Sequence, residues 1–267
     1  MNIGFLITAR LKSTRLPKKI LLPLNGYTVI ERVIQRAKQV VESDKVVLCT
    51  STDYQDFPLM ETAVRNNIYY YNGHPDDVLQ RLIDASDLFG FDFIIGITAD
   101  NPLFSIHHAK VIREMFKQDQ SLDFAYTTGM PIGINIYGIN VMALRTVCAV
   151  KKQIDTEIWG PLINRPEIFN IREIKAELQY IRPNYRITLD ERDDYDLIKF
   201  IYSKFEEYDI IDILDVYKLL DENNDMAILN SNVVQRDLDQ SIKNDIDIYY
   251  NKQKDRILSI KNSIYNC

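Results

Sequence analysis

The sequence predicts an α/β fold in which a mostly parallel, open sheet is flanked by helices and followed by a helical C-terminal extension. Two observations favour the sheet: short apolar strand-like segments alternate with amphipathic helix-like segments, and a basic run directly follows the first strand. A third observation indicates the extension, because Asn, Asp, Lys and Gln dominate after Asp209 and no strand is evident there. We therefore expect an α/β domain over residues 1–209 and a helical extension over residues 210–267.

The spacing of apolar residues separates strands from helices in the first half of the chain. Thr28 and Glu31 form a capping-box signature at the start of the first helix, and Ser105 is suited to cap the helix after the fourth strand. Pro75, Asp76 and Asp77 suit the first turn of a helix. The predicted strands are Asn2–Ala9, Lys45–Cys49, Ile68–Tyr71 and Phe93–Ile97, and the predicted helices are Thr28–Val41, Pro58–Asn66 and Pro75–Phe89.

The second half of the chain is less regular. The predicted strands Asp123–Thr127 and Asn135–Val141 surround a turn at Gly129-Met130-Pro131, and the later predictions are a helix over Asp155–Asn164, an extended segment over Glu177–Leu189 and a helix over Arg192–Tyr208. The extension after residue 209 is either an arm that pairs with a second copy of the chain, which would give a homodimer, or a loosely packed surface tail.

The composition is that of an ordinary globular protein, with 267 residues, 46% hydrophobic and 26% charged, and a formal net charge of -6. This acidity argues against a general nucleic-acid binder. No stretch approaches the roughly 18 apolar residues of a membrane span. The apolar run Ile3–Ile7 is too short for the core of a signal peptide.

The cysteines and histidines are few. Cys49, Cys148 and Cys267 are scattered and odd in number, so they predict neither a disulfide framework nor a zinc cluster, and a reducing cytoplasm is the expected compartment. The three histidines, His74, His107 and His108, are too few and too dispersed to predict a histidine metal site.

A basic loop, Arg10–Lys19, lies between the first strand and the first helix. Five of its ten residues are cationic and none is acidic. Ligands of open α/β sheets bind outside the carboxyl ends of the strands, so a loop at this place predicts a cradle for a phosphate chain rather than a solvated surface loop. The loop has no glycine, and neither G-x-x-x-x-G-K-[ST] nor G-x-G-x-x-G occurs in the chain. Phosphate binding would therefore depend on side-chain charge and on backbone N–H groups of the turn.

Two aspartates each follow an extended segment. Asp100 follows the apolar strand Phe93–Ile97 within the segment Ile97-Thr98-Ala99-Asp100-Asn101-Pro102-Leu103, and Asp190 ends Arg186-Ile187-Thr188-Leu189-Asp190. Carboxylates at such positions can hold Mg²⁺ and leave room for substrate phosphates. The alternative is that both only cap turns or helices, which is the role expected for Asp193 and Asp194.

These features, together with Gly73–Arg81, resemble a known family. Ala9–Lys19 resembles the opening motif of the cytidylyltransferases that activate acidic sugars. The whole segment from Met1 to Tyr208 resembles their SpsF-like branch, in which this motif reads roughly A-R-x-x-S-T-R-L-P-x-K. Gly73–Arg81 resembles the branch's G-x-x-D-D-V-L-x-R segment, Ile97–Leu103 its I-T-A-D-x-P-L segment, and Thr188–Leu197 its T-V-D-x-x-E-D-x-x-L segment.

The resemblance implies a Rossmann-like fold of the nucleotide-diphospho-sugar transferase type and a CTP-dependent cytidylyltransferase. It implies that CMP passes to an acidic sugar or a small phosphorylated acceptor for a surface polysaccharide, with release of pyrophosphate. Asp100 and Asp190 would bind Mg²⁺, and Arg10, Arg15 and Lys19 would act in catalysis. The implied CTP-binding residues are Ala9, Arg10, Ser13, Arg15, Lys19 and Arg81.

The chain departs from the family's pattern at several positions. Relatives commonly have glycine at Lys12 and Lys18, an acidic pair in the segment that matches Gly133–Tyr137, and E-H-V where this chain has Glu157-Ile158-Trp159. The last two departures lie where the acceptor is expected. Two alternatives therefore stay open: a glycosyltransferase of related fold that uses a nucleotide sugar, and a non-catalytic nucleotide-binding protein.

Overall fold

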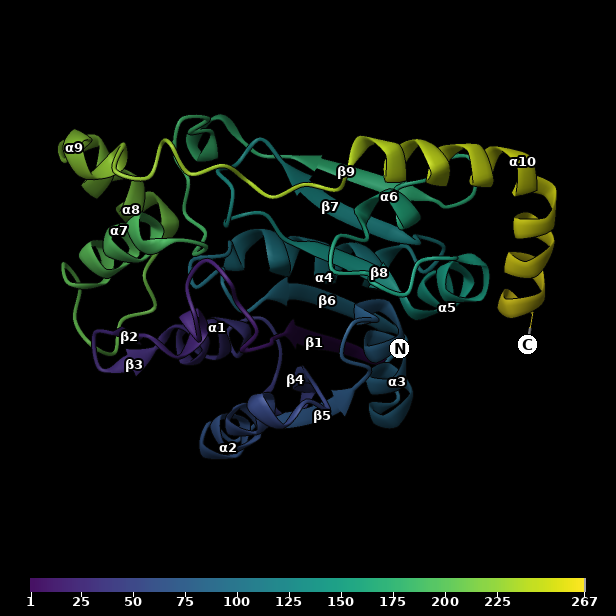
Figure 1. Ribbon diagram of the computed structural model, residues 1–267, viewed down its shortest axis with the longest axis horizontal. Coiled ribbons are helices and arrows are strands. Elements are labelled where there is room, and N and C mark those ends of the chain that lie inside the picture. Colours follow the sequence, from purple (N-terminus) through teal and green to yellow (C-terminus); the bar gives the residue numbers. More distant parts are fainter. Residues whose placement is uncertain (267) are drawn as a thin grey trace.

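A seven-stranded sheet forms the centre of the computed structural model, which describes residues 1–266 (Figure 1). The order of its strands is β5-β4-β1-β6-β8-β7-β9. Strands β5, β4, β1 and β6 are parallel, β8 runs antiparallel to both of its neighbours, and β9 is parallel to β7. The predicted α/β class with a mostly parallel sheet is therefore confirmed. The strands are β1 (Ile3–Thr8), β4 (Val46–Ser51), β5 (Tyr69–Gly73), β6 (Phe93–Thr98), β7 (Phe124–Thr128), β8 (Tyr137–Asn140) and β9 (Ile171–Lys175), with a small separate hairpin of β2 (Pro23–Leu24) and β3 (Tyr27–Thr28).

Helices cover both faces of the sheet. On one face, the buried side chains of Val33, Leu59 and Ile112 lie in one core cluster with β1 and β6, and on the other face Leu82 and Leu144 lie in a second. Burying both faces explains why the parallel strands read as continuous apolar runs. The helices are α1 (Val29–Ala37), α2 (Phe57–Arg65), α3 (Val78–Phe89), α4 (Ile106–Gln118), α5 (Val141–Val150), α6 (Gly160–Ile163), α7 (Arg192–Tyr202), α8 (Ile213–Glu222), α9 (Asn224–Ala227) and α10 (Gln240–Tyr265).

Two predicted helix starts are confirmed and one is corrected. Thr28 and Glu31 form the capping box of α1, and the Ser105 hydroxyl accepts the backbone N–H of His108 at the start of α4. Helix α3 begins at Val78 rather than at Pro75, because the Asp77 carboxylate caps it by accepting the N–H of Gln80. Pro75–Asp77 instead form a turn whose backbone N–H groups at Asp76 and Asp77 point to the His74 ring.

The middle of the chain differs most from the prediction. Strand β9 and helix α5 were not predicted, and the helix expected over Asp155–Asn164 is reduced to the four residues of α6. Thr156 explains the loss, since its N–H donates to the Asp76 carbonyl and its hydroxyl to Asp77, which draws the segment out of helical geometry. The extended segment Glu177–Leu189 contains a 3₁₀ turn at Leu178–Tyr180 and pairs only by an isolated bridge between Ile132 and Arg186.

The residues after Asp209 are helical, as predicted. Helix α8 packs through Val216 and Leu220 into a third core cluster with α7, while α10 packs through Ile246 and Tyr250 against α5. Figure 1 shows α7–α9 and α10 at opposite ends of the molecule, joined by one long connection. The division at residue 209 and the pairing with a second copy stay predictions.

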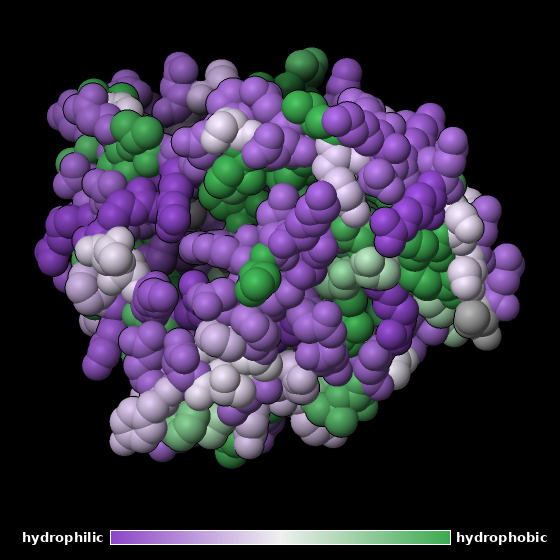
Figure 2. Space-filling view, turned by 45° about the vertical axis from the view of Figure 1, so that its right-hand side comes forward, coloured by the Kyte–Doolittle hydropathy of each residue, from purple (hydrophilic) through white to green (hydrophobic). Residues whose placement is uncertain are grey.

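The surface is mostly polar where Figure 2 shows it, and apolar side chains appear on that face in separate groups. No helix among the described residues is long and apolar enough to span a bilayer. Cys49 is buried and Cys148 half-buried, and both are free thiols, whereas Cys267 lies outside the described residues.

Candidate active site

Asp100 and Asp190, ninety residues apart in sequence, meet beyond the carboxyl end of β6. Asp100 follows β6 by two residues. The backbone N–H of Leu189 donates to the Asp100 carbonyl at 3.0 Å, which places Asp190 beside it. The two acids therefore converge, as the sequence predicts, at the edge of the sheet where α/β proteins bind their ligands.

The Lys19 ammonium group bridges the two acids. Its Nζ lies 2.7 Å from Asp100 Oδ2, 2.8 Å from Asp190 Oδ1 and 2.7 Å from the Leu189 carbonyl oxygen. Burial alone would lower the pKa of Lys19, but the charges of Asp100 and Asp190 outweigh it and raise that pKa. Burial would likewise raise the pKa of Asp190, yet Lys19, Arg15 and Arg186 together hold it below its ordinary value. Lys19 and Asp190 are therefore both charged at neutral pH.

Arg15 brings a second cation of the basic loop to the same acid. Its Nη2 lies 2.9 Å from Asp190 Oδ1, and its Nη1 lies 3.3 Å from Glu191 Oε1. The Arg15 side chain is one-third exposed, so it faces both the acid and the solvent. The basic loop is thus turned toward the two aspartates, and it places two cations where a phosphate chain would meet them.

A buried network fixes the orientation of Asp190. Arg186 donates through Nη2 to Asp190 Oδ2 at 2.7 Å and through Nε to Asp194 Oδ1 at 2.9 Å. Asp194 is fully buried and also accepts the backbone N–H groups of Asp190 and Glu191. Arg186 was not predicted and Asp194 was expected only to cap a helix, because residues 186–190 are not helical and an i, i+4 spacing signals a contact only on a helix.

The remaining residues of the predicted CTP motif lie along the first strand and its loop. Ala9 is buried, and its N–H donates to the Cys49 carbonyl, continuing the β1–β4 ladder. The Ser13 hydroxyl accepts the N–H of Leu16 at 3.3 Å, which shapes the turn. Arg10 is tied to the turn before α3 through the Pro75 carbonyl and through Asp76, at 3.1 Å. These three residues line the loop but do not touch the two acids.

Asp56 anchors the basic loop and was not foreseen. It is fully buried, and its carboxylate accepts the backbone N–H of Leu11 at 2.7 Å and the hydroxyl of Ser51 at 2.5 Å. A buried carboxylate paired in this way holds the loop at the end of β4.

Arg81 is buried next to the turn at Pro75, which the basic loop also contacts through Arg10. Its side chain is 1% exposed, and its guanidinium donates to the carbonyl oxygens of His74 and Pro75. Burial lowers its pKa. The Pro75 carbonyl that it holds is also the partner of Arg10, so the contacts describe a positioning residue, and its direct role in CTP binding stays a prediction.

The structure shows the backbone conformation or the contacts of several residues that depart from the family pattern. Lys18 adopts a left-handed backbone with φ of 53°, a conformation that favours the glycine common in relatives. In the segment that matches the acidic pair, the Asn135 amide donates to the carbonyl oxygens of Met130 and Pro131 and closes the 129–135 turn. Tyr137 packs edge-on against Trp159, with ring centroids 4.9 Å apart. Of the residues that depart from the pattern, Tyr137 and Trp159 therefore pack against each other.

The long connection between α9 and α10, residues 228–239, crosses the site, and we call it the strap (Figure 1). The Val234 carbonyl accepts from Arg15 at 3.4 Å, and Gln235 Oε1 accepts from Arg186 Nη1 at 2.6 Å. Asn230, 1% exposed, donates to the Arg186 carbonyl and to Asp194. The strap thus contacts both arginines that hold Asp190.

We expect Gln235→Ala to lower turnover several-fold while leaving the unfolding midpoint within about 2 °C, because one side-chain contact of Arg186 is lost near the surface. Steady-state kinetics and thermal unfolding check this. Gln240→Ala, at an exposed position just beyond the strap, is the control and should change neither quantity. A fall in stability without any change in turnover would show that Gln235 serves packing alone.

A cationic loop that faces two acids at the carboxyl end of a parallel sheet defines the class of enzyme, a nucleotidyltransferase. Residues 5–231 match the cytidylyltransferase family, and the chain belongs to that family. It is 27% identical over 233 residues to the spore coat polysaccharide biosynthesis protein SpsF of Bacillus subtilis, covering 85% of this chain and 97% of that protein.

One further relative and one solved structure are also similar to this chain. A 3-deoxy-manno-octulosonate cytidylyltransferase of Nitratiruptor sp. is 33% identical over 113 residues, which cover 41% of this chain and 45% of that enzyme. The structure of a cytidylyltransferase from Leptospira borgpetersenii superposes with a TM-score of 0.78 at 24% sequence identity, covering 89% of this chain and all of that one. This likeness shows that the two chains share a fold.

Proposed function

We propose that this protein transfers CMP from CTP to an acidic sugar of the ulosonic type, or to a small phosphorylated metabolite, in the synthesis of a surface polysaccharide. The observation that carries the proposal is Lys19, whose ammonium group joins Asp100 and Asp190 at the end of the basic loop. Membership of the cytidylyltransferase family favours CTP, and the Nitratiruptor relative favours an acidic sugar.

The oxygen-rich donor set fits Mg²⁺. Asp100 and Asp190 both reach one nitrogen atom with a carboxylate oxygen, so they are close enough to serve one small cation, and their side chains are 22% and 10% exposed. Oxygen ligands from one or two carboxylates, with room left for phosphates, are what Mg²⁺ takes in nucleotide enzymes. When bound, the ion would neutralise charge on the α-phosphate and lower the pKa of the acceptor hydroxyl.

In the proposed reaction, an acceptor oxygen forms a bond to the α-phosphorus of CTP while the bond to the bridging oxygen of the β-phosphate breaks. The electron pair leaves with pyrophosphate. Such transfers ask the protein mainly for alignment and charge neutralisation. Arg15 and Lys19 would offset the charge of the departing pyrophosphate, and Arg10 would hold the phosphate chain from the opposite side of the loop. Arg186 would keep Asp190 in place throughout.

The decisive experiment is a panel of nucleoside triphosphates, with pyrophosphate detection, against acidic sugars and sugar phosphates in the presence of Mg²⁺. We expect pyrophosphate with CTP and an acidic acceptor, and much less with UTP. Turnover of a nucleotide sugar instead of CTP would indicate a glycosyltransferase, and CTP binding without turnover for any acceptor would indicate a regulatory protein. Sedimentation of the full chain would test the proposed homodimer.

Arg15→Ala should weaken binding of CTP by about tenfold or more and binding of CMP far less, because the lost charge would face the β- and γ-phosphates. Calorimetric titration with each nucleotide measures both affinities. Lys12→Ala removes an exposed cation from the same loop and serves as the control. Equal weakening of CTP and CMP by Arg15→Ala would show that the phosphate chain lies elsewhere.

A further inference from the structure

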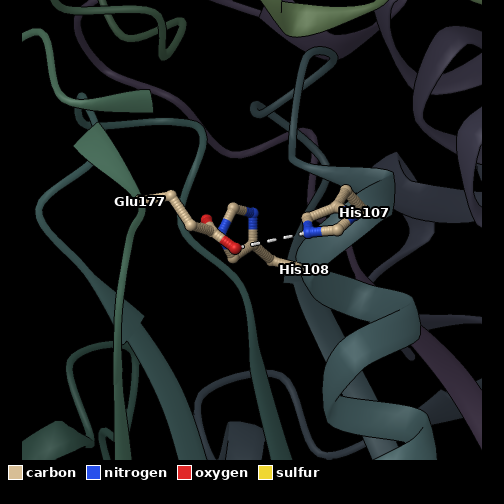
Figure 3. Close-up of side chains that lie close together, drawn as sticks. All are labelled: His107, His108 and Glu177. Atoms are coloured by element: carbon tan, nitrogen blue, oxygen red, sulfur yellow. Dashed lines mark hydrogen bonds and ion pairs between the residues drawn. The ribbon is translucent and has the colours of Figure 1, made fainter. Parts of the chain in front are cut away.

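His107, His108 and Glu177 form a side-chain cluster that the proposed reaction does not use. The two histidines stand in the first turn of α4, and Glu177 comes from the segment after β9, so the cluster joins two separate parts of the chain (Figure 3). His107 and His108 are therefore not dispersed, because both reach the same carboxylate. Their adjacency in sequence was visible, but their carboxylate partner, about seventy residues away, was not.

The three side chains point toward one another, as Figure 3 shows. His108 Nε2 lies 3.1 Å from Glu177 Oε2, and His107 Nε2 lies 3.6 Å from Glu177 Oε1. One nitrogen or oxygen atom from each residue lies within 4.8 Å of the others. Two imidazoles and a carboxylate are the protein ligands of many zinc sites, in which water takes the fourth position.

The surroundings orient the ligands in the way that metal sites require. Ser105 Oγ lies 2.7 Å from His108 Nδ1, so the hydroxyl can hold the far nitrogen of the ring while Nε2 faces the cluster. The Tyr180 ring stacks on His107 at 5.7 Å and meets His108 edge-on at 4.9 Å. His108 is almost fully buried, whereas His107 and Glu177 are half exposed, which leaves the cluster open to solvent on one side.

The Glu177 carboxylate would bring a negative charge to a divalent ion bound beside the positive end of the α4 dipole.

We propose that His107, His108 and Glu177 bind a divalent transition metal of the Zn²⁺ type, which clamps the segment after β9 to the start of α4. The clamp would act on the turn at 129–135, because this turn is held from both sides. The N–H of Ser105 donates to the Ile134 carbonyl, and the N–H of Ala176, next to Glu177, donates to the Thr128 carbonyl. Mg²⁺, which prefers oxygen ligands, would not bind here.

The test is thermal unfolding of the full chain with added ZnCl₂, together with the visible absorption of bound Co²⁺. When the free Zn²⁺ concentration is roughly ten times its dissociation constant, we expect the unfolding midpoint to rise by about 3–5 °C. MgCl₂ at the same concentration should cause no such rise. His107→Ala and Glu177→Gln should each weaken Zn²⁺ binding at least tenfold. Both positions are half exposed, so neither change threatens folding.

Matched controls separate this cluster from the aspartate pair. Lys110→Ala and Glu114→Gln alter the surface of α4 and should bind Zn²⁺ like the unaltered protein, as should Asp190→Asn. Absence of a midpoint shift and of Co²⁺ absorption in the unaltered protein would overturn the proposal. So would Zn²⁺ binding that survives both His107→Ala and Glu177→Gln but is lost in Asp190→Asn, which would place the ion at the acids.

Discussion

Replacing Lys19 by methionine should weaken CTP binding by about 10- to 100-fold and reduce pyrophosphate release by at least as much. The ammonium group is held by two carboxylates and a carbonyl, and methionine keeps its length without its charge or donors. Charge-assisted contacts of this kind carry about 1.5–3 kcal/mol each. Titration calorimetry with CTP measures the loss without requiring a known acceptor.

The free energy of unfolding at alkaline pH gives a second test of Lys19→Met. Since Lys19 has a raised pKa in the folded state, its contribution to the free energy of unfolding is fully present below its ordinary pKa of 10.5. That contribution is lost as the pH rises through the higher folded value. Lys19→Met should therefore lose less stability than the unaltered protein above about pH 10.5. Lys12→Met, at an exposed position of the same loop, is the control. Unchanged CTP affinity in Lys19→Met would remove Lys19 from the nucleotide site.

Asp190→Asn should abolish Mg²⁺-dependent turnover, by about 10²- to 10³-fold or more, and leave the fold intact. Asparagine fills nearly the same volume but lacks the negative charge that Lys19, Arg15 and Arg186 surround. Pyrophosphate release at increasing Mg²⁺ measures the effect, and circular dichroism checks the fold. Asp193→Asn, an exposed neighbour in the first turn of α7, should behave like the unaltered enzyme.

Acid unfolding gives an independent check on Asp190. Its folded pKa is depressed, so its stabilising contribution is present above its ordinary pKa of 3.8 and is lost as the pH falls through the lower folded value. Asp190→Asn should therefore show a weaker loss of stability below about pH 4. Retention of full Mg²⁺-dependent turnover in this variant would exclude Asp190 from the reaction.

The centre of the site could be predicted from the sequence because it follows from a rule of fold class. Once Asp100 and Asp190 are placed after strand-like segments of an open α/β sheet, both fall at the carboxyl edge, and so does a loop that follows the first strand. Lys19 reaches them because it ends that loop. The capping residues Thr28 and Ser105 were likewise predictable, since their signals lie within four residues.

The parts that could not be predicted depend on contacts between distant segments. Nothing in the sequence around Asp56 indicates that its carboxylate accepts the backbone N–H of Leu11. The role of Arg186 likewise depends on its contacts with Asp190 and Gln235, which only the folded chain brings together. Strand β9, at the edge of the sheet, has the sequence Ile-Arg-Glu-Ile-Lys, so it lacks both the apolar run of the central strands and a regular alternation. The prediction placed Pro75 inside a helix, whereas Pro75 lies in a turn. The His74 ring closes this turn by accepting the backbone N–H groups of Asp76 and Asp77, and the spacing of apolar residues does not reveal such a contact.

The lysine bridge also has a consequence for how the polypeptide matures. Because an ammonium group of the chain itself serves as counter-ion to the facing acids, the nascent protein can complete this centre before any divalent cation or nucleotide arrives. Folding at this place would then be uncoupled from cofactor supply, and in the proposed function the incoming nucleotide would have to draw Lys19 away from its resting partners.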